Sequence, residues 1–338
     1  MFRIHVVNSV KGGCGKSTFS LFMADYLSRN KINNVIIDLD ICGSSWYLSN
    51  KSFLEKKEKC SFLTDLILDY KGNIIRDHVF KVRTGEDADH LEPTIHVVMS
   101  DPQKAGIINE EEVDLFESTV LQLIKSFQGI TDYEYLKEKD ISKVEEPVAD
   151  IILDMPPGYE THSERILKHL LIDLNSELYL DYFKKKDSRS IYNNKSQKGY
   201  EIYLYMLSGV DRAKLEPNIY YINNLYKGLT YSTDITVFNP KRIFYIINNV
   251  DNPQIDNKSS EKNSVSELIK NNAKSIISKK AKYDYKIPSV YYIPHIDFTF
   301  AMNKFNASVK PDYTPDDFLV IEKNEKEIFK LIFDEIFM

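Results

Sequence analysis

The chain has 338 residues, of which 43% are hydrophobic and 28% charged, and its formal net charge is −6 at neutral pH. This composition excludes a disordered, collagen-like or coiled-coil protein, and the length suffices for a large α/β domain with a buried core. The sequence has no run of 18 apolar residues, which argues against a membrane-spanning helix. Its three cysteines form no CxxC pair, which argues against a disulfide framework and a zinc ribbon. The N-terminal residues do not resemble a signal peptide, so we expect a cytoplasmic protein.

Short apolar runs alternate with amphipathic stretches along the chain, which predicts an α/β fold with a mostly parallel, twisted sheet and helices on both faces. Several runs are almost continuous in Ile, Val, Leu and Tyr, as expected of strands that are covered on both sides. Strands are predicted at Phe2–Val10, Asn34–Asp40, Thr94–Met99, Ala149–Asp154, Glu177–Tyr182, Arg242–Asn248 and Ser289–Ile293. Helices are predicted at Lys16–Arg29, Glu110–Phe127, Ser163–Leu174, Ser264–Lys280 and Pro315–Phe337.

Two regions do not fit a minimal α/β layout. Residues 129–147 are charged and loop-like, and residues 184–240 are rich in Tyr and Asn with a broken periodicity. We interpret both as surface elaborations on a single domain that spans residues 1–338, with a separate small subdomain as the alternative. The sequence has no internal repeat and no Gly/Ser-rich or Pro-rich linker that would mark a domain boundary.

The strongest motif is KGGCGKST at residues 11–18, which directly follows the first predicted strand and opens the first predicted helix. Glycines allow backbone N–H groups to turn inward around an anion, and the helix N-terminus adds partial positive charge. In such a loop Lys16 would bridge the β- and γ-phosphates of a nucleotide, Ser17 would bind Mg²⁺, and Thr18 would reach the α-phosphate. We therefore predict a nucleotide-binding loop formed by Gly12, Gly13, Cys14, Gly15, Lys16, Ser17 and Thr18.

The start of this loop departs from the general phosphate-loop pattern. Val10 occupies the position where that pattern has a glycine, and a second lysine, Lys11, follows it. An ammonium group at position 11 lies too far round the turn to duplicate Lys16. We infer that Lys11 serves phosphates from another direction, for instance those of a facing subunit.

A carboxylate that can accompany the loop ends the predicted strand in ADIILDMPPG, residues 149–158. Asp154 is placed to hold a Mg²⁺-bound water, and the stiff Pro-Pro turn brings the Gly158 backbone towards the γ-phosphate. The alternative is a surface aspartate before a proline turn. Asp150, at the other end of this strand, is interpreted as a surface charge.

Two further carboxylates end the second predicted strand in VIIDLDICGS, residues 35–44. Period-2 alternation points Asp38 and Asp40 the same way, at the carboxyl edge where open α/β sheets bind ligands. We assign Asp38 to the metal and Asp40 to the attacking water, with two solvated carboxylates as the alternative.

These motifs resemble those of the ParA/MinD family of P-loop ATPases, with the ParA-like partition ATPases most similar. Residues 11–18 resemble the family's deviant Walker A motif, Asp38-x-Asp40 its first switch, and Asp154 to Gly158 its Walker B motif and second switch. Weaker likenesses continue to about residue 300, in Thr94–Pro102, Arg242–Val250 and Ser289–Asp297. ParA-like members share the absence of a glycine at the position of Val10.

The resemblance implies hydrolysis of ATP with Mg²⁺ by a homodimer that sandwiches two nucleotides. Lys11 would then reach the nucleotide of the partner, Asp40 would position water, and Asn248 and Pro294 would contact the adenine. The resemblance also implies slow hydrolysis that an activating adaptor of the ParB type stimulates.

The leading hypothesis is a molecular switch in DNA partition, chromosome segregation or intracellular positioning, with non-specific DNA as the favoured scaffold. The net acidic charge does not exclude local basic patches, although each is also consistent with a solvated face. The candidate patches are Lys184, Lys185, Lys186, Arg189, Lys195 and Lys198, and Lys270, Lys274, Lys279, Lys280 and Lys282.

Other functions remain as alternatives. A MinD-like membrane ATPase is one alternative, because the residues from Ile328 to Phe337 are apolar at helical spacing. However, acidic residues outnumber basic ones in this segment, which favours a helix docked on the core. A carboxylate-activating ligase of the dethiobiotin- or cobyrate-synthetase type is disfavoured by Lys11. An iron–sulfur carrier is disfavoured by the cysteine spacing.

Overall fold

The computed structural model describes the elements that surround the predicted loop. The described residues are 2–41, 62–68, 79–83, 94–103, 116, 119, 120, 123, 124, 127, 148–158, 200–209, 212–231, 242–248, 267, 271, 289–293 and 323–337. The strands are β1 (Phe2–Asn8), β2 (Asn34–Asp38), β3 (Val79–Arg83), β4 (Thr94–Val98), β5 (Asp150–Asp154), β6 (Tyr200–Gly209), β7 (Arg242–Asn248) and β8 (Ser289–Tyr292). The helices that can be given bounds are α1 (Lys16–Arg29), α3 (Leu63–Leu68), α8 (Arg212–Tyr231) and α11 (Lys323–Phe337).

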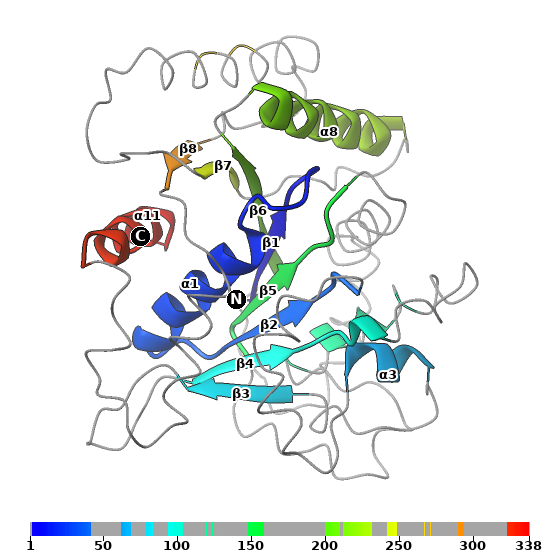
Figure 1. The fold of residues 1–338 in the computed structure, drawn as a ribbon, viewed down its shortest axis with the longest axis vertical. Coiled ribbons are helices and arrows are strands. Elements are labelled where there is room, and N and C mark those ends of the chain that lie inside the picture. The colour runs from blue at the N-terminus through cyan, green and yellow to red at the C-terminus, as the bar shows by residue number, and fades with distance from the viewer. Residues whose placement is uncertain are drawn as a thin grey trace, which may run out of the picture.

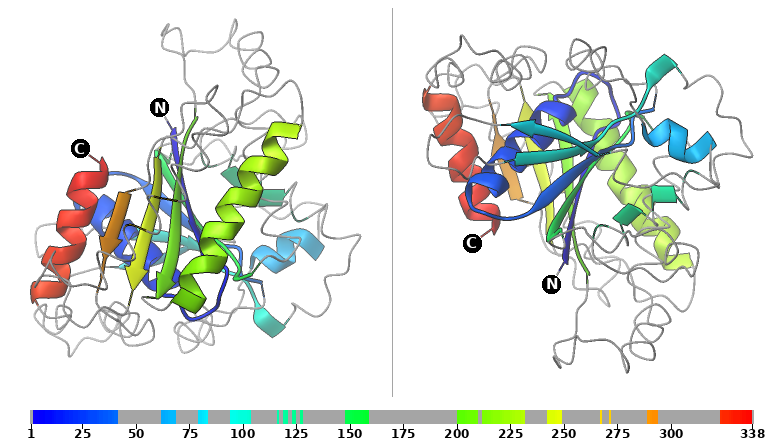
Figure 2. Two further views of the ribbon diagram at one scale, coloured as in Figure 1. Left: turned by 90° about the horizontal axis from the view of Figure 1, so that it is seen from above. Right: turned by 90° about the horizontal axis from the view of Figure 1, so that it is seen from below.

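The eight strands form one sheet in the order β3-β4-β2-β5-β1-β6-β7-β8 (Figure 1). Neighbouring strands are parallel throughout, except that β3 runs antiparallel to β4. Both views in Figure 2 place α1 and α11 on one face of the sheet and α8 and α3 on the other. The predicted α/β architecture, a mostly parallel sheet with helices on both faces, is therefore confirmed.

The core consists of two apolar layers, one on each side of the sheet. Alternate residues of a strand point to opposite faces, so Val6 of β1 joins the layer under α8 whereas Val7 joins the layer under α1 and α11. The β1 strand lies in the middle of the sheet, between β5 and β6, and Ile4, Val6 and Val7 are fully buried. The phosphate loop therefore follows a buried strand in the middle of the sheet.

The C-terminal helix α11 docks on α1 through aromatic rings. Phe333 is fully buried and lies 5.4 Å from Phe19, measured between ring centroids, and Phe329 stacks on Phe22 at 4.3 Å. The preference for a core-docked helix is confirmed, because the apolar face of α11 is covered by α1. The described helix begins at Lys323, later than the predicted Pro315, and residues 315–322 lie outside the described part of the chain. Among the described residues, no helix combines the length and apolarity needed to span a bilayer.

The interpretation of residues 184–240 as a surface elaboration is wrong for the part that the structure describes. Tyr200–Gly209 forms β6, which pairs with β1 in the middle of the sheet, and Arg212–Tyr231 forms α8. The pattern was misleading because β6 is buried on both faces, with Tyr203 and Tyr205 in one layer and Leu204 in the other.

Several other predictions concern residues that the structure does not describe. These are the elaboration at 129–147, the strand Glu177–Tyr182 and the helix Ser163–Leu174. Only single positions within the predicted helices Glu110–Phe127 and Ser264–Lys280 are described, and all of them are helical. The antiparallel strand β3 and the short helix α3 were not predicted.

Candidate nucleotide-binding site

The phosphate loop connects β1 to α1 at the carboxyl edge of the sheet. Gly13 and Gly15 have φ angles of +71° and +84°, and Gly15 is the N-cap residue of α1 in the left-handed conformation. Residues other than glycine avoid this conformation because their Cβ atom comes too close to a backbone carbonyl oxygen. The two glycines therefore allow the backbone to curl into a loop immediately before the helix N-terminus, as predicted for an anion-binding turn.

The two lysines of the loop have opposite surroundings. Lys16 is only 8% exposed, and its Nζ donates a hydrogen bond to Ser9 Oγ at 3.2 Å. Ser9 Oγ in turn donates to the Lys11 carbonyl at 2.8 Å, so one hydroxyl ties both lysine positions together. Lys11 itself is exposed. Lys16 is thus held within the loop, whereas the Lys11 side chain is available to a molecule outside it.

Two residues at the start of α1 have hydroxyls that the predicted ligand would use. Ser17 is half-buried. Thr18 is buried, and its Oγ1 has no hydrogen-bond partner among the described residues. A buried hydroxyl without a partner is unfavourable, and a phosphate oxygen next to the helix N-terminus would satisfy it. The environment of Thr18 therefore fits a bound nucleotide.

Asp38 and Asp154 lie side by side at the carboxyl edge, because they are partners in the register of β2 and β5. Both are almost completely buried, with exposed fractions of 2% and 1%. Burial, reinforced by the neighbouring charges of Asp154 and Asp40, raises the pKa of Asp38 well above its usual value. Two adjacent buried carboxylates favour a cation between them, and hard oxygen ligands are those that Mg²⁺ prefers.

Backbone N–H groups hold the Asp38 carboxylate in place. Oδ1 accepts a hydrogen bond from the Asp40 N–H at 3.2 Å, and Oδ2 accepts one from the Ser100 N–H at 3.3 Å. The Ser100 hydroxyl also donates to the Asp38 carbonyl at 2.7 Å. Asp40 is partly exposed, just beyond the end of β2. The two aspartates of this motif therefore differ in environment, which suits one for a metal and the other for water.

The structure brings Gly158 and Asn248 to the loop in positions that the sequence did not specify. The Gly158 N–H donates to the Ser9 carbonyl at 3.2 Å, so the turn after β5 rests on the start of the loop. The Asn248 side-chain amide donates to the Cys14 carbonyl at 3.1 Å. Asn248 was assigned to adenine, and the described geometry places its amide against the loop backbone. Pro294, the other predicted adenine contact, lies outside the described residues.

Two site residues on α8 were missed by the sequence interpretation. Asn218 bonds to the backbone of Val10, immediately before Lys11. The Lys214 side chain lies over the end of β6, because a Cβ atom built on Gly209 would be 2.9 Å from Lys214 Cδ. Burial raises the pKa of the Cys14 thiol, and the charges of Lys16 and Lys214 oppose that effect. No local motif marks these residues, since α8 itself was not predicted.

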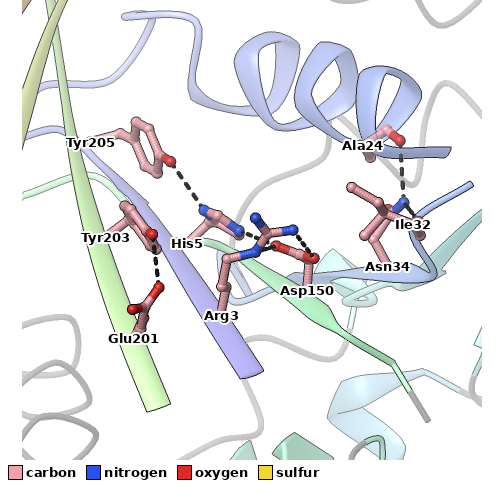
Figure 3. A network of polar contacts seen from close by, with 9 residues as sticks. All are labelled: Arg3, His5, Ala24, Ile32, Asn34, Asp150, Glu201, Tyr203 and Tyr205. Carbon is pink, nitrogen blue, oxygen red and sulfur yellow. Dashed lines mark hydrogen bonds and ion pairs between the residues drawn. The ribbon is translucent and has the colours of Figure 1, made fainter. Parts of the chain in front are cut away.

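The interpretation of Asp150 as a surface charge is wrong. Asp150 is completely buried at the amino edge of the sheet, away from the loop, and it forms an ion pair with Arg3 at 2.6 Å. His5 Nε2 lies 2.6 Å from Asp150 Oδ1, and His5 Nδ1 lies 3.0 Å from the Tyr205 hydroxyl (Figure 3). Strand β1 thus carries a buried polar network at its beginning and the phosphate loop at its end.

Comparison with known proteins supports the fold described above. A family model of the ParA group, described as the NUBPL iron-transfer P-loop NTPase, matches residues 2–59, which include β1, the loop, α1 and β2. No curated protein sequence matches the chain. Among solved structures, apo McdA from Cyanothece has a TM-score of 0.53 at 13% identity, with 99% of this chain and 100% of that chain covered.

Two further structures have the same arrangement over nearly their whole length. The cell division ATPase MinD from Pyrococcus furiosus has a TM-score of 0.52 at 15% identity, with 99% of this chain and 98% of MinD covered. This chain has the ParA/MinD fold of P-loop NTPases. A candidate plasmid partition protein from Borrelia burgdorferi, solved with AMPPNP, has a TM-score of 0.50 at 15% identity, with 99% and 98% covered. The resemblance inferred from the motifs is therefore confirmed for the ParA/MinD fold.

Proposed function

We propose that the protein is an ATPase that hydrolyses Mg²⁺-bound ATP to ADP and phosphate. The observation that carries this proposal is the convergence of the buried Lys16 with Asp38 and Asp154 at one edge of the sheet, beside a loop with left-handed glycines. Lys16 would neutralise the β- and γ-phosphates, and Ser17, Asp38 and Asp154 would hold Mg²⁺ directly or through water. The bound cation would supply further charge neutralisation. Asp40 would orient the attacking water from its partly exposed position.

We further propose that the active form is a homodimer with two nucleotides between the subunits. Lys16 is buried in its own loop while Lys11, only five positions earlier, is exposed. An exposed cation at the rim of a phosphate site is suited to the nucleotide of a facing subunit. In this arrangement each protomer binds ATP with Lys16 and completes the neighbouring site with Lys11. ATP binding would then control association, as a molecular switch requires.

The proposed role is positioning or partition of cargo in the cytoplasm, with DNA as scaffold and a ParB-type adaptor as the stimulating partner. The fold is shared with McdA, with MinD and with a candidate plasmid partition protein, which supports a role of this general kind. The basic clusters proposed for DNA, around 184–198 and 270–282, lie outside the described residues. The covered apolar face of α11 disfavours the membrane-bound alternative.

ATP hydrolysis by four variants tests the catalytic proposal. Lys16→Ala is expected to lose nucleotide binding and hydrolysis together, whereas Asp40→Ala is expected to bind ATP and remain dimeric without hydrolysing it. Lys11→Ala is expected to bind ATP and lose both dimerisation and hydrolysis. Lys330→Ala, an exposed lysine on α11, is the control and should hydrolyse ATP at the wild-type rate. Full hydrolysis by Lys16→Ala would refute the proposed site.

Retention on non-specific DNA tests the proposed scaffold. Binding should be stronger with ATP than with ADP, and it should weaken as salt increases, because phosphate contacts release counterions. Retention that depends on neither nucleotide nor salt would reject DNA as the scaffold. It would leave the ATPase proposal intact.

A further inference from the structure

Helix α8 contributes a buried amide to the start of the phosphate loop. Asn218 is completely buried, and its Oδ1 accepts a hydrogen bond from the Val10 N–H at 2.8 Å. Its Nδ2 donates to the Leu207 carbonyl of β6 at 2.7 Å. One side chain therefore links three segments: the loop, α8 and the central strand next to β1. The primary amide carries a donor and an acceptor on one planar group, so this single side chain makes both bonds at once.

We propose that Asn218 is a positioning residue that fixes the backbone from which Lys11 projects. This inference rests on the proposed function, in which Lys11 serves the nucleotide of the partner subunit. Val10 directly precedes Lys11, so the bond from the Val10 N–H to Asn218 fixes the chain on one side of Lys11. The bond from Ser9 Oγ to the Lys11 carbonyl fixes it on the other side.

The surroundings of Asn218 make this anchor rigid. Its neighbours Leu215 and Ile219 are buried in the apolar layer between α8 and the sheet, and Val10 packs against the same layer. Movement of the amide would therefore require α8 to lift from the sheet. The loop backbone next to Lys11 is thus held by the core, although the Lys11 side chain is exposed.

A fixed backbone next to Lys11 lowers the entropic cost of dimerisation. A long lysine side chain on a mobile backbone loses conformational freedom when it binds, and a fixed backbone limits that loss. Lys16 makes no direct contact with this anchor, because it belongs to the first turn of α1 and is linked to the start of the loop only through Ser9 Oγ. Loss of Asn218 should therefore affect dimerisation more than nucleotide binding by the monomer.

The test compares Asn218→Ala with Asn34→Ala. Asn34 is a matched control, since it is 1% exposed and its amide donates to the Ile32 carbonyl at 3.0 Å, on the α1 side of the sheet. Both variants lose buried hydrogen bonds, so both should unfold at a lower temperature than wild type. Below that temperature, two constants are measured for each: the affinity for a fluorescent non-hydrolysable ATP analogue, and the dimerisation constant with that analogue saturating.

We expect Asn218→Ala to weaken dimerisation about tenfold or more while changing nucleotide affinity by less than about threefold. Asn34→Ala should leave both constants near wild type. Asn218→Asp preserves the acceptor for the Val10 N–H and should dimerise better than Asn218→Ala. Asn218→Leu, which is similar in size to asparagine and makes neither hydrogen bond, replaces the alanine variant if that variant does not fold.

Four outcomes separate the inference from the proposed function. Wild-type dimerisation by Asn218→Ala, or equal weakening by Asn34→Ala, would overturn the positioning role. Equal weakening by the alanine and aspartate variants at position 218 would also overturn it. Failure of the wild-type protein to dimerise with the analogue would instead contradict the proposed dimer.

Discussion

Asn248 donates a hydrogen bond from its side-chain amide to the Cys14 carbonyl at 3.1 Å, across 234 positions of sequence. Asn248 is the last residue of β7, and Cys14 lies in the phosphate loop. The same amide closes the space over the next loop residue, because a Cβ built on Gly15 would lie 2.4 Å from Asn248 Nδ2. The contact between β7 and the loop therefore requires glycine at position 15.

Gly15→Ala should abolish ATP binding and lower stability. Its φ of +84° costs an alanine about 1–2 kcal/mol, and the contact with Asn248 adds to that penalty. The loop is then expected to move away from the conformation that surrounds a phosphate. Thermal unfolding and equilibrium binding of a fluorescent ATP analogue measure the two effects.

Gly12→Ala is the matched control, because a Cβ at Gly12 meets no atom within 4 Å. Its unfolding temperature should stay near that of wild type. The double variant Gly15→Ala with Asn248→Ala should recover part of the stability that Gly15→Ala alone loses, since the clash is removed while the backbone strain remains. Simple additivity of the two single effects would show that the contact is not the source of the penalty.

Asp150→Ala should destabilise the protein by about 3–5 kcal/mol, because it leaves the buried His5 and the partly exposed Arg3 without their shared partner. Asp25→Ala provides a comparison, since Asp25 pairs with the half-exposed Arg29 within α1 and such pairs contribute about 0.5 kcal/mol. Urea unfolding of the two variants gives both values. Equal losses would mean that the network of Figure 3 contributes no more than a surface pair.

The stability of the protein should decrease as the pH falls below about 6.5, through His5. Burial lowers the pKa of His5, against the opposing effect of Asp150, so the unfolded chain takes up a proton on this residue before the folded chain does. The neutral tautomer that donates from Nε2 to Asp150 and accepts the Tyr205 hydroxyl at Nδ1 satisfies both contacts. Urea unfolding between about pH 7.5 and 5.5 should show a smaller slope for His5→Gln than for wild type. An unchanged slope would exclude His5 as its source.

Asp150 acts in a lower pH range. Burial alone would raise its pKa, but the hydrogen bonds and charges of His5 and Arg3 outweigh burial and lower it. Its contribution to stability is therefore present above the usual aspartate pKa of about 3.9 and is lost as the pH falls through the lowered value. The two residues give separate acid transitions in the same network.

Phe333→Ala should cost about 3–5 kcal/mol, because the ring is completely buried against Phe19 and Phe329. Leu331→Ala should be nearly neutral, since Leu331 is 66% exposed on the same helix. Thermal unfolding and flotation with anionic liposomes are measured for both variants. Loss of liposome binding by Leu331→Ala, without a change in stability, would favour the membrane alternative over the docked helix.

The sequence predicted those parts of the site that are encoded locally. The loop at 11–18 and the strand ending at Asp154 are short patterns whose residue types are required by phosphate and metal binding, and α1 was located at its exact bounds. Strands β1 and β2 were predicted two residues too long, since one more apolar residue, Val10 or Leu39, follows the end of each. For the loop, α1 and the strand that ends at Asp154, the local sequence pattern was sufficient to predict the structure.

The features that were missed depend on contacts between distant residues. Asn218 reaches Val10 over 208 positions, and no property of α8 alone indicates that contact. Asp150 resembled a solvated strand end, and its partners Arg3 and His5 lie 147 and 145 positions away in the sequence. Strand β6 was missed because it is buried on both faces and therefore shows no alternation of apolar and polar residues.

The dimerisation state with a non-hydrolysable ATP analogue tests the central claim most directly. Sedimentation velocity is measured for wild type and for Lys11→Ala, with nucleotide occupancy determined in the same samples. We expect wild type to sediment as a dimer with the analogue and as a monomer with ADP, whereas Lys11→Ala should remain a monomer although its site is occupied. A wild-type monomer at full occupancy, or a Lys11→Ala dimer as tight as wild type, would contradict the central claim.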